Sequence, residues 1–521
     1  IQTAWSETQS SKNLIIMIGD GMGPAQVTLA RLYAKTYLDQ EQLVLDQLWV
    51  GMNNTFAQAD VYKNETKAIV SDSAAAATAL ATGHRTYNRS IAISNEAMGR
   101  PYASIMQAAK NEGKATGLIT TTRVTHATPA AFFAHVRHRD MENAIASQYL
   151  DKDIDVILGG GEENFVSDPK KSHFGQAQRE DGLDLITEFE NKGYHIVYDQ
   201  EALQTSKTDK LLGLFSASHI PYNIDRDDSV PNLSQQLQKA LTILSQNDVG
   251  FVLLVEGGRI DQAAHANDAY STILETLEFD QAIAIALKYA QQHPDTSLIV
   301  TADHETGGMS IARDQDNSVD LSILHEQKAA SETISQLLKT ADSKAKIIDI
   351  LVNYLGDQDW QDSEIAQLLA EKNDKESVLN DIIAKRARIG WTSTAHTGVD
   401  VGTYAFGPVT DLLRGYIENT EVNTASLSTL ELDLDQAEQQ LQAQYLYPRF
   451  INDKDQQPLF PLLKLAEALN IELDDPLNLN TIPHQETNDE FYVSLEGANQ
   501  ILNTELGWDP LSERITLDWL K

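Results

Sequence analysis

The sequence predicts an α/β fold in which a mostly parallel central sheet is flanked by helices on both faces. One observation is a set of short, continuous apolar runs, each leading into a loop of glycine or polar residues; they cover residues 13–19, 115–120, 155–158, 251–255 and 297–301. Helical patterns lie between them, for example at 102–111 and 268–291. Strands without polar alternation are buried on both faces, which is typical of parallel sheets between two helix layers.

Polar residues gather where these apolar runs end. Asp20 follows the first run within a glycine loop, segment 125–129 lies beyond the second, and Asp303 and His304 follow the last. In open parallel sheets the ligand binds beyond the carboxyl ends of the strands. The sequence therefore predicts one shared active site at this edge of the sheet.

The residue pattern changes at two places along the chain, at a charged helical insert and at the start of an acidic C-terminal extension. Residues 1–420 are expected to form a catalytic domain whose last core strand lies at 403–408, with a charged helical insert at about 321–387. Residues 421–521 carry 19 acids and five bases and are expected to form a separate acidic C-terminal extension.

The extension contains two similar passages, at 458–473 and 491–517. Each predicts an apolar entry, a short amphipathic helix and a strand. This weakly resembles the stalk-type repeat found beside copper amine oxidases and on bacterial surface proteins. An embellishment packed on the catalytic core is the equally good alternative, and neither interpretation comes with copper ligands.

Composition narrows the class of protein. The 521 residues carry a net charge of −36, which disfavours a nucleic-acid-binding face and is typical of a salt-adapted surface. No apolar run approaches the 18 residues of a transmembrane helix. The chain has no cysteine, so a tight metal site must use His, Asp and Glu. Because no signal-peptide pattern follows Ile1, we expect that such a segment has been removed.

Segment 66–83 carries the candidate nucleophile. The pair Ile69 and Val70 predicts a buried strand end, and the alanine run after Ser73 predicts a helix. Ser71 and Asp72 suit the cap position, which is the more common role of such residues. At a helix N-terminus Ser73 lies where backbone N–H groups favour a phosphate or an alkoxide.

Six other side chains have the chemistry and spacing of metal ligands. Asp261 and His265 are four residues apart, so they share one helix face. The others lie in loops at strand ends: Asp20, Asp303, His304 and His396. Mixed His and carboxylate shells suit Zn²⁺, and two such ions about 4 Å apart can clamp a transferring phosphoryl group.

Three further residues complete the predicted site. Thr128 and Glu256 offer only oxygen, which indicates a harder Mg²⁺ site that shares Asp20. Arg139 lies in a basic segment of a very acidic chain, and its guanidinium fork matches a phosphate. A surface arginine paired with nearby acids is the alternative interpretation of Arg139.

Taken together, these motifs resemble the alkaline phosphatases. The resemblance covers IIMIGDGMG, SDSAAAATALATG, THATPAAFFAHVRHR, VEGGRID with the following His265, VTADHETG and AHTG, in the order of that family. It implies Ser73 as nucleophile, Asp261, His265 and His396 around one zinc, and Asp20, Asp303 and His304 around a second zinc bridged by Ser73. It also implies Asp20, Thr128 and Glu256 around magnesium, with Arg139 on the phosphate.

Two positions differ from other members of that family. His126 stands where some members have Asp, so it would ligate the third metal and make that site less selective for Mg²⁺. Gln262 stands where relatives have Lys, His or Trp, and a neutral amide would hold phosphate less tightly. Asp72 and Gln262 are both expected to line the phosphate site.

The expected activity is hydrolysis of small phosphate monoesters through a phosphoserine. We also expect a homodimer in the periplasm or outside the cell. A phosphodiesterase, phosphonate hydrolase or phosphomutase of the same superfamily is the nearest alternative. A cell-surface interaction protein with a degenerate core is another, whereas a serine esterase is disfavoured because no G-x-S-x-G occurs.

Overall fold

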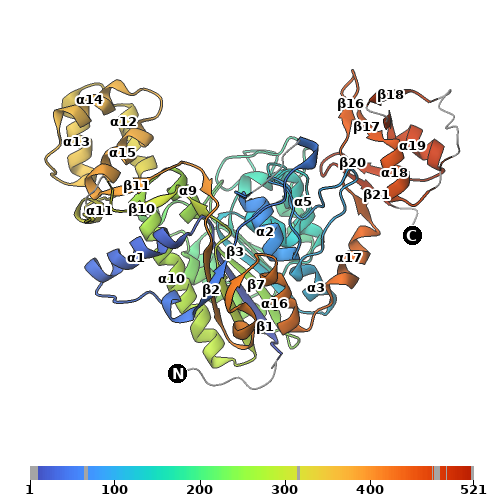
Figure 1. Cartoon of the computed structure of the whole chain (residues 1–521), viewed down its shortest axis with the longest axis horizontal. Coiled ribbons are helices and arrows are strands. Elements are labelled where there is room, and N and C mark those ends of the chain that lie inside the picture. The colour runs from blue at the N-terminus through green and yellow to red at the C-terminus, as the bar shows by residue number, and fades with distance from the viewer. Residues whose placement is uncertain are drawn as a thin grey trace.

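A ten-stranded sheet forms the centre of the molecule (Figure 1). The computed structural model describes residues 10–63, 69–313, 317–471, 473, 482–487 and 490–517. In spatial order the strands are β14 (Gly415–Ile417), β2 (Trp49–Asn53), β13 (Val401–Phe406), β8 (Thr296–Thr301), β1 (Asn13–Gly19), β7 (Phe251–Gly257), β3 (Ala115–Arg123), β4 (Val156–Gly160), β6 (Leu211–Leu214) and β5 (His195–Val197). The predicted fold class is confirmed.

One strand breaks the parallel arrangement. β13 runs antiparallel to both of its neighbours, β2 and β8, while the other neighbouring strands pair in parallel. The prediction that 403–408 holds the last core strand was wrong, because β14 follows it and pairs with β2. Three residues are too few to give a periodic signal, so only the pairing identifies β14.

Helices cover the sheet on both faces, and β1 shows how. Ile15 and Met17 belong to one apolar cluster, whereas Leu14, Ile16 and Ile18 belong to another on the opposite face. The first face carries α1 (Pro24–Tyr37), α8 (Leu233–Leu244) and α10 (Ala269–Gln292). The second carries α2 (Ser73–Thr82), α3 (Ile105–Asn111), α4 (Ala127–Phe133), α5 (Glu142–Asp151), α6 (Leu185–Asn191) and α16 (Glu421–Leu430).

The remaining core elements are short. They are α7 (Gln200–Thr205), α9 (Arg259–His265), β9 (Glu305–Thr306), β10 (Met309–Ile311), β11 (Ile389–Trp391), β12 (His396–Thr397), and the 3-10 helices at Leu45–Leu48, Val61–Lys63, Glu162–Asn164, Asn223–Asp225 and Pro408–Leu413. β9 pairs with β12, and β10 pairs with β11.

The helical insert and the C-terminal lobe lie at opposite ends of the sheet domain (Figure 1). The insert contains α11 (Ser322–His325), α12 (Ser331–Lys339), α13 (Lys344–Leu355), α14 (Asp362–Ala370) and α15 (Lys375–Ala387). After α17 (Leu434–Gln442) comes the C-terminal lobe, which we define as the described residues of 445–517. It contains β15 (Tyr445–Leu446), β16 (Ile451–Asn452), β17 (Pro458–Pro461), α18 (Leu462–Ala468), β18 (His484–Thr487), β19 (Glu490–Val493), α19 (Leu495–Leu502), β20 (Gly507–Asp509) and β21 (Arg514–Thr516).

The two similar tail passages each contain a strand followed by a helix, β17–α18 and β19–α19. The strand predicted after the second helix is present as β20 and β21. After the first helix, residues 472 and 474–481 lie outside the described part of the chain. The resemblance to a stalk repeat and the boundary at 421 stay predictions.

The predicted strand end before Ser73 was wrong. Ile69 and Val70 are not in a strand, and 51% and 41% of their surface is exposed. Residues 66–68 of the same prediction lie outside the described residues. The pair packs against Gly398 in the loop after His396, so its apolar side chains cover a loop rather than the sheet.

Candidate active site

Strand register brings the predicted ligands to one edge of the sheet. Ile18 of β1 lies level with Glu256 of β7 on one side and with Thr301 of β8 on the other. Asp20 and Asp303 each follow two residues after these levels. The carboxyl ends of three neighbouring parallel strands therefore supply carboxylates to the same place.

The helix that begins at Ser73 is capped as predicted by its sequence. The Asp72 carboxylate accepts a hydrogen bond from the Ala75 N–H, 3.1 Å away, and Gly83 ends the helix with φ of 73°. Ser73 is 1% exposed and is the first helical residue. Its Oγ is 3.3 Å from Nε2 of His304, so the hydroxyl faces the ligand groups.

We call Asp261, His265 and His396, which are predicted to hold one zinc, the first ligand group. Nε2 of His265 is 3.0 Å from Nε2 of His396 and 3.3 Å from the Asp261 carboxylate. α9 places Asp261 and His265 one turn apart, and His396 arrives on β12 rather than in the predicted loop. The Nδ1 atoms of the two histidines face the carbonyls of Thr394 and Ser71, which leaves both Nε2 atoms for a ligand.

Asp20, Asp303 and His304 form the second ligand group. Nε2 of His304 is 3.5 Å from Oδ1 of Asp20 and 3.3 Å from Oδ2 of Asp303. The ring of His304 stacks on that of His396 with centroids 3.6 Å apart, so the first and second groups are neighbours. The Oδ1 atom of Asp303 accepts hydrogen bonds from the N–H groups of Gly21 and His304, which orients its other oxygen inward.

Asp20, His126 and Glu256 form the third group. Nδ1 of His126 is 3.8 Å from carboxylate oxygens of both acids. Thr128 is the second residue of α4 and is fully buried. Ligand atoms in each of three sets lie within 4.8 Å of one another: Asp261, His304 and His396; Asp20, Asp303 and His304; Asp20, His126 and Glu256.

Several of these buried atoms have no hydrogen-bond partner among the described residues. They are both carboxylate oxygens of Asp20, Oδ2 of Asp303, Oε1 of Glu256, Nδ1 of His126 and Oγ1 of Thr128. A buried polar atom without a partner is costly, and an unpaired buried carboxylate more so. The donor set and its spacing fit metal ions, because two ligands about 2.1 Å from one tetrahedral zinc are about 3.4 Å apart.

The pKa shifts of the site residues also favour bound cations. Burial and then the charge of Asp261 raise the pKa of Asp303 to about 8, and burial and then Asp303 raise the pKa of Asp20 well above its usual range. Burial opposes protonation of His265, but the hydrogen bond and charge of Asp261 prevail and raise its pKa to about 9. Burial and then His396 lower the pKa of His304. Ionised Asp20 and Asp303 are therefore unfavourable in this site unless bound cations compensate their charge.

Arg139 reaches the site from the loop after α4. Its Nη1 donates to Asp72 at 3.1 Å, and its Nη2 lies 2.9 Å from Nε2 of His126. Arg139 and Asp72 side chains are 17% and 15% exposed. The guanidinium of Arg139 is largely buried, between the helix that begins at Ser73 and the third ligand group. Arg139 is therefore not the surface arginine of the alternative interpretation, although it does pair with an acid, Asp72.

Gln262 lies beside the first ligand group on α9. Its Oε1 accepts a hydrogen bond from Nη1 of Arg259 at 2.8 Å, and the Arg259 guanidinium lies 3.6 Å over the ring of Tyr222. The amide oxygen of Gln262 is thus held by a cation.

Three residues around the site were not predicted from the sequence. Thr306 donates to Asp261 at 2.5 Å. Glu305, 3% exposed, accepts from Gln26 and from the Gly308 and Met309 N–H groups, and Thr397 also donates to it. His219 packs edge-on against His126, with ring centroids 5.7 Å apart. Only adjacency of Glu305 and Thr306 to His304 could have pointed to any of them.

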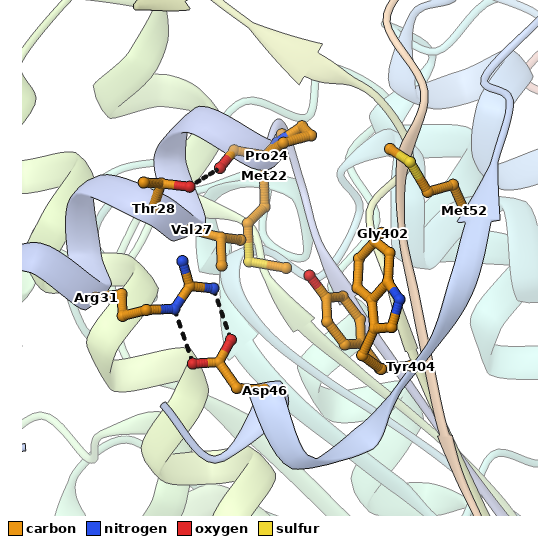
Figure 2. A pocket seen from close by; sticks show the side chains of 11 residues that line it. Met22, Pro24, Val27, Thr28, Arg31, Asp46, Met52, Gly402 and Tyr404 are labelled. Atoms are coloured by element: carbon orange, nitrogen blue, oxygen red, sulfur yellow. Dashed lines mark hydrogen bonds and ion pairs between the residues drawn. The ribbon is translucent and has the colours of Figure 1, made fainter. Parts of the chain in front are cut away.

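A cavity of about 570 Å³ opens behind the loop that follows Asp20. Figure 2 shows Met22, Val27 and Tyr404 around it, with Arg31 bound to Asp46 by two hydrogen bonds. The register of β13 on β2 shifts between Thr403 and Tyr404, and this irregularity lets both Trp49 and Met52 line the same cavity.

The arrangement matches a known family. The family model for alkaline phosphatase covers residues 11–432. The chain belongs to the alkaline phosphatase family. Alkaline phosphatase 3 of Bacillus subtilis (strain 168) is 35% identical over 81% of this chain and 90% of its own length. The repressible alkaline phosphatase of Saccharomyces cerevisiae is 34% identical over 83% of each chain.

Solved structures agree with this assignment. A cold-active alkaline phosphatase from the psychrophile Shewanella sp. is 39% identical and superposes with a TM-score of 0.71 over 80% of this chain and 99% of its own. The alkaline phosphatase of Thermus thermophilus is 31% identical, with a TM-score of 0.72 over 84% and 96%. The chain is therefore a metal-dependent phosphoric monoester hydrolase. Within the described residues, no helix is both long enough and apolar enough to span a bilayer.

Proposed function

We propose that this phosphatase transfers the phosphoryl group of a small phosphate monoester to Ser73 and then to water. The observation that carries the proposal is the position of Ser73. Its Oγ lies at a helix N-terminus, 3.3 Å from Nε2 of His304, and the preceding residue, Asp72, accepts a hydrogen bond from Arg139. No other described serine has this combination of burial, helix terminus and ligand groups.

The ligand groups favour three metal ions. Asp261, His265 and His396 would hold one zinc, and Asp20, Asp303 and His304 would hold a second, with Ser73 beside it. Asp20, Glu256 and Thr128 would hold magnesium, and Nδ1 of His126 adds a nitrogen that makes this third site softer. When bound, such ions supply positive charge that acidifies hydroxyl groups and water and stabilises a leaving oxygen.

The side chains of the chain itself bind and orient the reacting group. Ser73 Oγ, as alkoxide, forms a bond to phosphorus while the bond to the alcohol oxygen breaks, which gives a phosphoserine. Arg139 and the N–H groups at the start of α2 donate to the non-bridging oxygens of the phosphoryl group, in the bound substrate as well as in the transition state. A water then attacks the phosphoserine, releases phosphate and returns the serine. Because these contacts go to the phosphoryl group, many alcohols are accepted as leaving groups.

Ser73→Ala tests the nucleophile. Rapid-quench measurement on the metal-loaded enzyme should show no phosphoenzyme, with turnover lowered by a factor on the order of 10⁴. Ser71→Ala, next to the cap, is the matched control and should retain both phosphoenzyme formation and normal turnover. A full-size phosphoenzyme burst in Ser73→Ala would refute the assignment. Parallel assays with a phosphate monoester and a diester separate the proposed activity from the phosphodiesterase alternative.

We also propose a homodimer that buries the cavity of Figure 2. Trp49 and Tyr416, on neighbouring strands at the sheet edge, are 53% and 59% exposed, and large exposed apolar side chains at one place favour a protein interface. Light scattering should report two chains, and Trp49→Lys should give one.

A net charge of −36 favours activity in a salty medium, and we propose that the protein works in the periplasm or outside the cell. Cell fractionation tests that location.

A further inference from the structure

The C-terminal lobe lies outside the family match at 11–432, yet it is joined to the segment that carries Arg139. The joint begins at Arg137, two residues before Arg139. Nη2 of Arg137 donates to the carbonyl of Tyr447 in the lobe and to the carbonyl of Ala97, the latter at 3.1 Å. Its Nη1 donates to the hydroxyl of Tyr87 at 3.2 Å.

A second arginine completes the joint from the lobe side. Nη2 of Arg449 donates to Asp60 at 3.0 Å and to Asn95 at 3.3 Å. Its guanidinium lies 4.3 Å from the ring centre of Tyr62 and 4.7 Å from that of Tyr87. Tyr87 therefore contacts both arginines, one through its hydroxyl and one through its ring face.

Backbone hydrogen bonds and an apolar contact also attach the lobe to loop 94–100. The N–H of Tyr447 donates to the carbonyl of Gly99 at 2.9 Å, and that of Arg449 donates to the carbonyl of Ala97 at 2.7 Å. Met98 is 4% exposed and belongs to the apolar cluster of the lobe, with Phe460 among its members. Loop 94–100 of the catalytic part is thus inserted into the lobe.

Backbone hydrogen bonds connect the segments of Arg137 and Tyr87 close to Arg139, the proposed phosphate ligand. Val136 and Ile91 exchange two backbone hydrogen bonds, at 3.0 and 3.2 Å, and the Arg139 N–H donates to the carbonyl of Arg89 at 2.7 Å. These contacts form a short bridge between 87–91 and 136–139. The lobe holds one residue on each side of that bridge.

The other end of the bridge holds Asp72. Oδ1 of Asn88 accepts from the Asp72 N–H at 3.0 Å, and the Arg89 N–H donates to the Asp72 carboxylate at 3.1 Å. Arg89 does so with φ of 75°, a strained value for a side chain of its size. A non-glycine residue keeps such a conformation only where the surroundings impose it, and here the surroundings include the bridge.

We propose that the C-terminal lobe is a working part of the phosphate site: Tyr447 and Arg449 fix Arg137 and Tyr87, and these positioning residues set Arg139 and Asp72 through the bridge. The inference rests on the proposed function, because it takes Arg139 as the phosphate ligand. A guanidinium that binds phosphate in the ground state and the transition state contributes uniform binding. Its displacement therefore raises KM and weakens inhibition by phosphate more than it lowers kcat.

The test uses the full, metal-loaded chain with Arg449→Ala and Arg137→Met. Both variants should raise KM for 4-nitrophenyl phosphate and the dissociation constant of inorganic phosphate by about tenfold, the loss expected when a charge-assisted hydrogen bond is misaligned. The metal content should not change. Arg449→Lys keeps the cation between the two rings and should restore part of the loss.

Arg386→Ala is the matched control. Arg386 also lies over an aromatic ring, 4.5 Å from Trp360, and pairs with Glu364, but it belongs to the insert at the other end of the molecule. It should lower the melting temperature and leave KM and phosphate affinity unchanged. If Arg137→Met does not fold, Arg449→Ala carries the test, since its side chain is 24% exposed.

Two results overturn the inference alone: unchanged KM and phosphate affinity in Arg449→Ala, or an equal rise in Arg386→Ala. Calorimetric binding of inorganic phosphate to the wild-type protein separates this from a failure of the proposed function. A wild-type protein that neither binds phosphate nor hydrolyses the monoester overturns both.

Discussion

The molecule contains two clusters of buried carboxylates that differ in how their charge is balanced. In the site, Asp20, Glu256 and Asp303 are at most 2% exposed. On α10, Glu275 and Glu278 are each 3% exposed, so burial is the same. Burial of acids therefore does not distinguish a metal site from a structural ion pair in this protein.

Their partners do distinguish them. Glu278 accepts from Arg226 at 2.5 Å, from the Leu233 N–H at 2.8 Å and from Asn223 at 3.0 Å, while Glu275 accepts from the Asn223 N–H at 2.6 Å. The site acids instead keep oxygens that no described residue satisfies. One cluster carries its own cation, and the other requires cations from outside.

Removal of metal is expected to give the largest effect, because only the cluster in the site depends on metal. Chelation should lower activity by a factor of about 1,000 or more, because metal charge contributes several kcal/mol to the transition state. Activity assays and metal analysis, before and after addition of zinc and magnesium, measure this. Full activity in metal-free protein would contradict the ligand assignment.

Charge removal should act in opposite directions in the two clusters. Asp303→Asn should lose metal, yet its metal-free form should be more stable than metal-free wild type, because an unpaired buried carboxylate is gone. Glu278→Gln leaves Arg226 without its partner and should cost about 3–5 kcal/mol with or without metal. Denaturant unfolding of both variants in both states measures the four stabilities. Equal destabilisation by Asp303→Asn in the metal-free state would count against the comparison.

The α10 cluster should also give the metal-loaded protein a pH-dependent stability. Burial and then the charge of Glu278 raise the pKa of Glu275 to about 7, above the value of about 4.3 in an unfolded chain. Its contribution is complete below about pH 4 and is lost as pH rises through 7. Glu275→Gln should therefore stabilise the protein by on the order of 2 kcal/mol at pH 8 and much less at pH 5.

Thermal unfolding between pH 5 and 8.5 provides that measurement. Burial raises the pKa of Glu278, but the charge and hydrogen bond of Arg226, together with the hydrogen bonds from Leu233 and Asn223, lower it below its usual range. Glu278→Gln should therefore lose stability at pH 8 and serves as the control. A Glu275→Gln variant with the same pH profile as wild type would show that Glu275 is not the titrating group.

Gln262 lies between the clusters and should give the smallest effect. It contacts Arg259, whose charge also acts on Glu275, and it is next to Asp261. Gln262→Lys places an ammonium beside the phosphate site, which should tighten phosphate inhibition about fivefold, near 1 kcal/mol for one partly screened charge. Gln262→Met is the neutral control. Unchanged inhibition in Gln262→Lys would sink the idea that Gln262 eases product release.

Much of the site could be predicted because its residues lie in local motifs. Asp261 and His265 fall on one turn of helix, and Asp72 and Ser73 fall at a cap before an alanine run. Both are determined by short-range spacing. Glu305 could not be found in this way, since its partners Gln26 and Thr397 lie 279 and 92 residues away.

The sequence by itself determined the sheet strands that end in candidate metal ligands, the capped helix at Ser73 and the donor atoms that these candidates offer. These follow from periodicity, capping chemistry and the donor atoms of single residues. Only the tertiary structure decided that Ile69 and Val70 cover a loop, that β14 joins the sheet and that the C-terminal lobe holds Arg137. Each of these depends on contacts between distant segments, which no local pattern of apolar and polar residues encodes.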